Sequence, residues 1–183
     1  MDPETQLKPT KDVRQAWVLG LMAVTLVLMF AFIVLPYVDP GKQLAVAAAD
    51  FELPAIHGAA QGKSIRLSEF AGRVVVLDFW ASWCGPCREQ MPILDRVRQD
   101  YDASDVTFLG VSTDAEPNAA LEFLKKHPVS YVSVLDRTGS VSQQFGVTKL
   151  PTLVVIDASG KVTHNEARLV GERSVRDLIE AAR

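Results

Sequence analysis

Two cysteines, Cys84 and Cys87, stand two residues apart and are the only cysteines of the chain. A run at 74–80 that is apolar except for Asp78 precedes them and a helical pattern follows, so both thiols are expected between a buried strand and a helix. Unpaired backbone N–H groups at the start of a helix stabilise a thiolate. The pair therefore predicts thiol–disulfide exchange, in which Cys84 attacks a substrate disulfide and Cys87 resolves the mixed disulfide.

The residues around the thiols favour redox chemistry over the other uses of this spacing. Gly85 leaves room for an approaching backbone, and Pro86 stiffens the loop by fixing φ. A zinc site needs two more ligands, and haem attachment needs a histidine where Arg88 stands. An inert disulfide is the remaining alternative, although so small a loop constrains the unfolded chain little. We expect no metal, and no cofactor besides the cysteine pair.

Three further residues are candidates for the site. Asp78 interrupts the apolar run, and a lone buried carboxyl has a raised pKa, so it could accept and return the proton of Cys87. The alternative is that Asp78 faces a loop and accepts backbone hydrogen bonds. Pro151 precedes a strand and can be cis or an ordinary trans proline. Trp83 is expected at the rim, where it could screen the sulfurs from water.

The segment after residue 50 alternates between strand and helix patterns. This alternation predicts an α/β fold whose central mixed sheet is covered by helices on both faces. The predicted strands are 51–53, 65–67, 74–80, 106–112, 131–135, 152–156 and 162–169, and the predicted helices are 86–101, 117–127, 140–145 and 174–182, the last capped by Ser174.

The N-terminal part of the 183-residue chain has a different character. Between Arg14 and Asp39 no residue is charged, which as a helix would span about 36 Å and cross a bilayer. We predict a tail without regular structure at 1–15, a transmembrane anchor at 16–38, a linker at 39–49 and a domain at 50–183. Basic residues precede the apolar segment more often than they follow it, which places the N-terminus in the cytoplasm.

Two alternatives to a retained anchor remain. The small residues at 44–49 resemble a signal-peptide processing site, although the apolar segment is longer than a signal peptide needs. A buried core helix is rarely apolar all round at this length. The net charge is −3 with both signs interspersed, and no run of Lys and Arg occurs, which argues against a nucleic-acid partner.

With these residues assembled, the chain from about 50 to 183 resembles the thioredoxin superfamily. It most resembles the membrane-anchored bacterial branch typified by TlpA and ResA. The motifs that carry the resemblance are the segment 77–87, Pro92 in the following helix, and the segment 146–152. The resemblance implies a thioredoxin-like fold with an extra helix and strand before the proline. It also implies that Pro151 is cis and faces the cysteine pair, and that the Leu150 backbone binds substrate beside Trp83, Gly85 and Pro86.

These observations together predict a protein-disulfide oxidoreductase on the outer face of a bacterial inner membrane. We expect it to reduce disulfides of exported proteins, with apocytochrome c or copper-site proteins as possible clients and a membrane electron donor for its re-reduction. One alternative is a thioredoxin dedicated to cytochrome c maturation, which is weakened because Gln90 replaces a glutamate found in many such proteins. Others are a dithiol Cu(I) metallochaperone and a thiol peroxidase, for which Ala81 stands where peroxiredoxins carry Thr or Ser.

Overall fold

The computed structural model describes residues 11–34 and 47–183, with side chains described for 17–30 and 47–183. The chain divides into two compact units, residues 1–43 and residues 44–183. Parts of three predictions lie outside the described residues: the tail up to residue 10, the end of the anchor from residue 35, and the linker up to residue 46.

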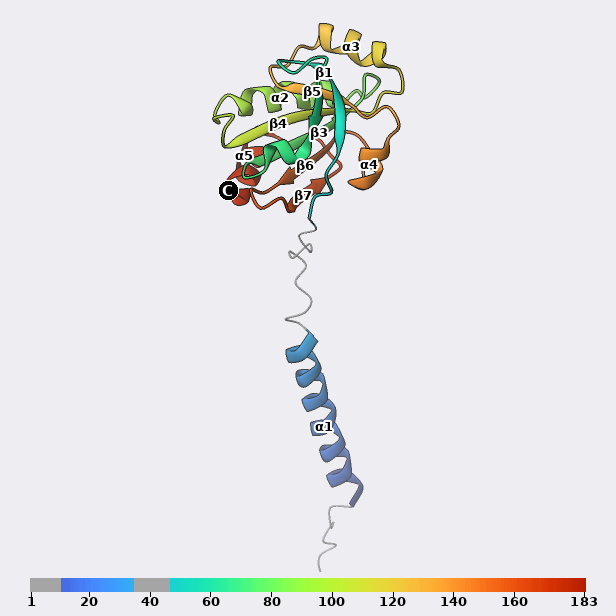
Figure 1. Ribbon diagram of the computed structural model, residues 1–183. Coiled ribbons are helices and arrows are strands. Elements are labelled where there is room, and N and C mark those ends of the chain that lie inside the picture. Colours follow the sequence, from blue (N-terminus) through green and yellow to red (C-terminus); the bar gives the residue numbers. More distant parts are fainter. Residues whose placement is uncertain (1–10, 35–46) are drawn as a thin grey trace, which may run out of the picture. The chain divides into compact units, whose positions relative to one another are not determined.

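The described part of the first unit is the helix α1 (Lys11–Val34), which Figure 1 shows in blue. It begins five residues before the predicted span, so the prediction that the tail lacks regular structure up to residue 15 is wrong. The physical reason is that Lys, Arg and Gln are good helix formers regardless of their polarity. Every side chain described in α1 is exposed. Across residues 11–34 and 47–183, no helix combines the length and the apolarity that crossing a membrane requires.

The second unit is built on a seven-stranded mixed sheet in the order β2-β1-β5-β4-β3-β6-β7 (Figure 1). The three central strands β5, β4 and β3 are parallel, and the other pairings are antiparallel. The strands are β1 (Glu52–His57), β2 (Ser64–Arg66), β3 (Val74–Trp80), β4 (Val106–Ser112), β5 (Val132–Leu135), β6 (Thr152–Ile156) and β7 (Val162–Glu166).

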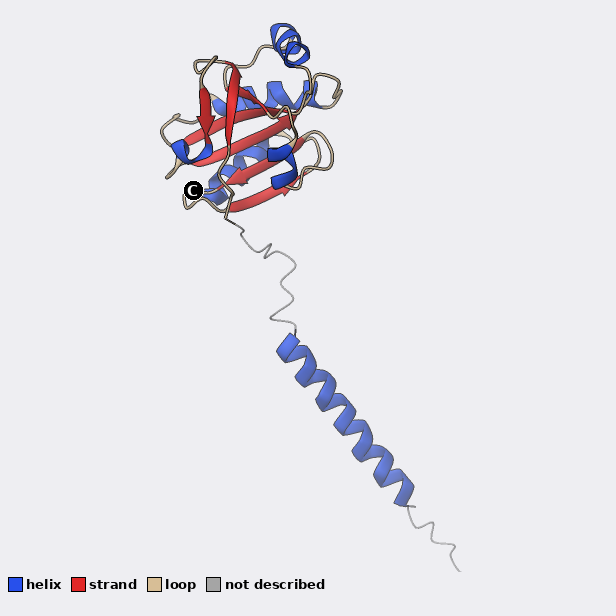
Figure 2. Ribbon diagram, turned by 45° about the vertical axis from the view of Figure 1, so that its right-hand side comes forward, coloured by secondary structure: helices blue, strands red, loops and turns tan. Residues whose placement is uncertain are grey.

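Helices lie on both faces of this sheet, as Figure 2 shows, which confirms the predicted α/β class. Apolar side chains of α2, α3 and α5 pack on one face, and those of α4 and of the β1–β2 hairpin pack on the other. The helices of this unit are the short 3-10 helix η2 (Leu67–Phe70), α2 (Cys87–Arg98), α3 (Pro117–Lys126), α4 (Ser140–Gln144) and α5 (Glu172–Ala182).

Strand β3 leads into the cysteines and is buried along its whole length. Its side chains alternate between the two apolar clusters, with Val76 and Trp80 facing α2 while Leu77 and Phe79 face the opposite side. The Trp80 ring stacks on Phe123 of α3 at a centroid distance of 5.1 Å. Because β3 is held on both faces, the loop that follows it starts from a rigid support.

The start of α5 differs from the prediction. The helix begins at Glu172, with Gly171 before it, so Ser174 is not its cap. The Glu172 carboxylate accepts from Arg96 at 2.6 Å and from Arg176 at 3.4 Å, and a negative charge is favourable in the first turn of a helix. One ion pair to α2 and one within α5 therefore support a first turn that lies before the predicted cap.

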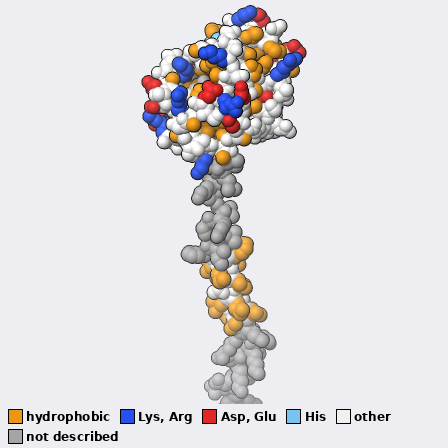
Figure 3. Space-filling model, in the orientation of Figure 1, with side chains coloured by type: hydrophobic (Ala, Val, Ile, Leu, Met, Phe, Trp, Pro, Cys, Tyr) orange, Lys and Arg blue, Asp and Glu red, His pale blue; other side chains and the backbone are white. Residues whose placement is uncertain are grey.

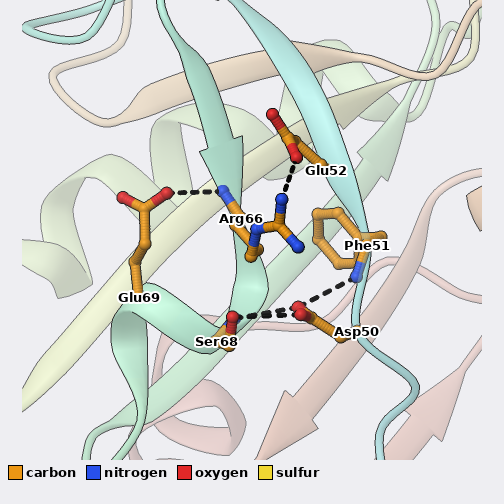
Figure 4. A network of polar contacts seen from close by, with 6 residues as sticks. All are labelled: Asp50, Phe51, Glu52, Arg66, Ser68 and Glu69. Carbon is orange, nitrogen blue, oxygen red and sulfur yellow. Dashed lines mark hydrogen bonds and ion pairs between the residues drawn. The ribbon is translucent and has the colours of Figure 1, made fainter.

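A polar network fixes the entry of the chain into the domain (Figure 4). The Asp50 carboxylate accepts the backbone N–H groups of Phe51 and Ser68 and the Ser68 hydroxyl, each at 3.0 Å. Arg66 pairs with Glu52 across the hairpin. Burial raises the pKa of Asp50, but the hydrogen bonds outweigh it and hold the pKa below its usual value. The start of β1 is thus tied to η2.

Candidate active site

Cys84 and Cys87 form a disulfide with a Cα–Cα distance of 5.4 Å. Cys84 lies in the turn after β3, where its N–H donates to the Ala81 carbonyl, and Cys87 is the first residue of α2. The Cys87 N–H donates to the Cys84 sulfur at 3.2 Å. A backbone donor at the start of α2 is therefore directed at Cys84, an arrangement that stabilises a thiolate when the pair is reduced.

Exposure differs sharply along the motif. Cys87 is fully buried, and Cys84 retains 3% of its surface in the oxidised state. Trp83 beside it is 71% exposed, and Gly85 and Pro86 are also exposed. The sequence predicted Trp83 at the rim, and the structure places it at the surface next to the nucleophile. The substrate-binding roles of Trp83, Gly85 and Pro86 stay predictions.

Asp78 lies in the middle of β3 and is 2% exposed. Its carboxylate accepts from Gln90 Nε2 at 3.0 Å and from the Tyr131 hydroxyl at 3.3 Å. Burial raises the pKa of Asp78 to about 6, and the two hydrogen bonds oppose this shift. Its partners are side chains in the core rather than loop backbone. A carboxyl with this pKa can gain and lose a proton near neutral pH.

Gln90 and Tyr131 were not identified from the sequence as hydrogen-bond partners of Asp78. Gln90 is fully buried, and its Oε1 accepts the Val170 N–H at 3.0 Å. Because that N–H can only donate, the amide oxygen must face it and the NH₂ group must face Asp78. The available signal was the position of Gln90, three residues after Cys87 on the same face of the helix. Tyr131 carried no local signal.

A second buried carboxylate supports the cysteine loop. Asp114 is 4% exposed and follows β4. It accepts the Ser82 N–H at 2.9 Å, the Ser82 hydroxyl at 2.8 Å and the Ser112 hydroxyl at 3.0 Å. Beside these hydrogen bonds, the Thr113 N–H donates to the Trp80 carbonyl at 2.9 Å. The loop that carries Cys84 is therefore fastened to the end of β4, which sequence patterns did not indicate.

The Leu150–Pro151 peptide bond is cis, as the resemblance implied. Pro151 is buried and immediately precedes β6, whose first residue, Thr152, pairs with Phe79 of β3. The proline is thereby set beside the end of the strand that leads to the cysteines. The roles of Leu150 and Pro151 in substrate binding stay predictions. Among the described parts of the chain, no three His, Cys, Asp or Glu side chains are grouped to hold a metal ion.

Comparisons with known proteins agree with this geometry. A profile of the Redoxin family matches residues 45–179. The thiol-disulfide oxidoreductase ResA of Bacillus thuringiensis subsp. konkukian is 32% identical over 120 residues, which cover 66% of this chain and 68% of that relative.

Solved structures share the fold. A protein from Chlorobium tepidum, assigned as a DsbE thiol:disulfide interchange protein, superposes with a TM-score of 0.69 and 33% identity, covering 75% of this chain and 96% of that one. The exposed lipoprotein thioredoxin Etrx1 of Streptococcus pneumoniae gives 0.64 and 26%, covering 73% and 99%. Since the family profile spans nearly the whole second unit, the chain belongs to the Redoxin family of the thioredoxin superfamily, among its TlpA/ResA-like protein-disulfide oxidoreductases.

Proposed function

We propose that this protein reduces disulfides in exported proteins from the outer face of a bacterial cytoplasmic membrane. The observation that carries the proposal is the Cys84–Cys87 disulfide at the start of α2, with its N–H donor on the Cys84 sulfur. Asp78 lies buried in β3, the strand that leads to the cysteines, and is linked to α2 by Gln90.

The reaction transfers two electrons in two steps. The Cys84 thiolate attacks one substrate sulfur, forms a mixed disulfide and releases the other substrate sulfur as a thiolate. Cys87 then gives its proton to Asp78 and attacks the Cys84 sulfur, so that the internal disulfide forms and the second substrate thiolate leaves. Asp78 returns the proton to that thiolate or to water. The substrate disulfide is reduced, and the cysteine pair is oxidised.

The direction of electron flow is proposed from the Gly85-Pro86 spacer, which matches general thioredoxins. The midpoint potential of the full-length chain, equilibrated with glutathione or dithiothreitol, tests this. A value near −270 mV, about that of thioredoxin, supports a reductase. A value near −120 mV, about that of DsbA, would identify an oxidant instead.

The membrane anchor is proposed for residues 16–38 on the basis of the uncharged sequence. The described side chains of α1 include exposed Trp17, Leu21 and Phe30, and so much apolar surface needs an apolar environment. Figure 3 shows apolar side chains of the described part of α1 in orange, whereas charges of both signs are interspersed on the domain face in view. The description of Etrx1 as an exposed lipoprotein supports an extracytoplasmic domain.

Localisation is tested by fractionation and protease treatment. The full-length chain should stay in the membrane pellet after carbonate washing, and protease added to spheroplasts should digest the domain. A chain released by carbonate, or protected from protease until the cells are lysed, would contradict the proposed topology.

The clients are identified by trapping. Cys87→Ala removes the resolving thiol, so substrate proteins should accumulate as mixed disulfides on Cys84, whereas the matched variant Cys84→Ala should trap none. We propose apocytochrome c and proteins with copper-site cysteine pairs as clients. We also propose a membrane thiol protein that reduces the Cys84–Cys87 disulfide again after each turnover. Equal trapping by both variants would contradict the assignment of attacker and resolver.

A further inference from the structure

Asp78 and Tyr131 come from segments separated by an intervening strand. Asp78 lies on β3 opposite Gly110 of β4, and Gly110 lies opposite Ser133 of β5. Tyr131 immediately precedes β5. Its hydroxyl must therefore pass over β4 to reach the Asp78 carboxylate at 3.3 Å.

The residue at the crossing point has no side chain. A Cβ atom at Gly110 would lie 3.3 Å from Cε2 of the Tyr131 ring, 2.6 Å from the Ser133 hydroxyl and 3.0 Å from the Trp80 indole nitrogen. The 2.6 Å distance is shorter than real Cβ contacts, and the other two are tighter than most of them. A side chain at Gly110 would therefore crowd the tyrosine ring and clash with Ser133 where the ring lies across the strand.

The tyrosine is also held from its other side. The preceding residue, Ser130, donates its N–H and its hydroxyl to Asp95 of α2, each at 2.6 Å. The ring lies 6.5 Å from that of Phe108, centroid to centroid, and Tyr131 is 2% exposed. Both the backbone entry and the ring of Tyr131 are therefore fixed in the direction of Asp78.

The two hydrogen-bond partners of Asp78 differ in what they can do. The amide of Gln90 can only donate toward Asp78, because Val170 fixes its orientation. A hydroxyl can donate to a carboxylate and can turn to accept from a carboxylic acid. A proton on Asp78 Oδ1 would face the Gln90 donor, so the proton belongs on Oδ2, which faces Tyr131.

The surroundings of Asp78 bring few other charges. Its strand neighbours, Gly110 on β4 and Leu153 on β6, carry none. From helix α2 its hydrogen-bond partner is the uncharged Gln90. Burial, then Asp78 itself, and least of all the charge of Asp95 on α2 raise the pKa of Tyr131 well above its usual value.

We propose that Tyr131 is the positioning residue that holds the proton of Cys87 on Asp78 Oδ2 during resolution. The Tyr131 hydroxyl donates a hydrogen bond to Oδ2 while Asp78 is deprotonated, and it turns to accept one when Oδ2 is protonated. The inserted α3–β5 segment then contributes to the chemistry of the site as well as to the sheet. This inference rests on the proposed function, in which Asp78 receives that proton.

The test uses the reduced full-length chain in detergent and a nitrobenzoate disulfide whose released thiolate is coloured. The first coloured thiolate reports attack by Cys84, and the second reports resolution by Cys87. In the wild type the second phase should rise with pH about a midpoint near 6. In Tyr131→Phe that midpoint should move up by about one pH unit, since a hydrogen bond to a charged oxygen is stronger than one to a neutral oxygen.

The first phase should be unchanged in Tyr131→Phe, and the second should slow about fivefold at pH 6. Tyr101→Phe, which alters a tyrosine outside this network, is the matched control and should behave as wild type. A purely structural role would not move the pH midpoint of one phase alone.

Fluorotyrosine incorporation provides a second measurement that preserves the fold. A more acidic phenol is a stronger donor and a weaker acceptor, so the midpoint of the second phase should move down, and it should not move in the Tyr131→Phe background. Unchanged midpoints in both experiments would overturn the role of Tyr131 alone. A second phase unaffected by Asp78→Asn would instead overturn the proposed proton transfer to Asp78.

Discussion

Replacing Asp78 by Asn should stabilise the folded protein at neutral and alkaline pH. The pKa of this buried carboxyl is about 6 against a usual value of 3.8, so the folded state binds its proton more tightly than the unfolded state does. The sign follows directly: the contribution of Asp78 to stability is complete below pH 3.8 and is lost as the pH rises through 6. Above that pH, folding must bury a charge.

The magnitude follows from the same two values. At about 1.4 kcal/mol for each pKa unit, the burial of ionised Asp78 costs about 3 kcal/mol at pH 8 and about 0.5 kcal/mol at pH 4. Asparagine has nearly the same shape, and its oxygen can accept from Gln90 while its amide donates to the Tyr131 oxygen. Asp78→Asn should therefore recover most of the 3 kcal/mol at pH 8 and almost none at pH 4.

The assay is guanidinium unfolding of the oxidised full-length chain at several pH values, followed by tryptophan fluorescence, in which the change on unfolding comes mainly from buried Trp80 because Trp17 and Trp83 are already exposed. Asp157→Asn is a control of opposite sign. Burial raises the pKa of Asp157, but hydrogen bonds from Ser159 and Lys161 lower it overall, so this variant should lose stability above pH 4. Equal stability of Asp78→Asn and wild type at pH 8, or a difference that does not change with pH, would refute the reasoning.

Two further predictions concern the cysteine loop. Asp114→Asn weakens the hydrogen bonds that hold Ser82, so it should destabilise the domain by about 1–3 kcal/mol and slow the alkylation of reduced Cys84. Asp102→Asn, on the surface, is its control. An alkylation rate equal to that of the wild type would show that other contacts hold the loop. Trp83→Ala removes an exposed ring, so the free energy of unfolding should change by less than about 0.5 kcal/mol, while KM for a protein disulfide should rise. An unchanged KM would exclude contact between Trp83 and the substrate.

Three adjacent strands of the sheet could be predicted to the residue because their signal is local. Strands β3, β4 and β6 are short, mainly apolar and β-branched segments bounded by polar or turn residues, and the structure has them at the predicted positions. The start of α5 could not be predicted, because its first turn depends on Glu172 meeting Arg96 of α2. That contact joins residues 76 positions apart.

The same distinction applies to the site. The cysteine pair, the burial of Asp78 and the cis bond before Pro151 were all anticipated from short motifs or from family resemblance. The partners of Asp78 were not, because Tyr131 is 53 residues away from it and approaches over another strand. Whether a side chain can cross at Gly110 is decided by strand register, which no local pattern encodes.

The near-complete burial of Cys84 in the oxidised state has a consequence for selectivity. Only 3% of the Cys84 surface is exposed to a small thiol such as glutathione. Such a thiol makes too few contacts to displace the residues that cover Cys84. A folded partner that covers Trp83 gains contact area large enough to open the way to the sulfur. The disulfide should then be reduced quickly by protein partners and slowly by small free thiols. Small thiols would therefore not compete with the protein electron donor.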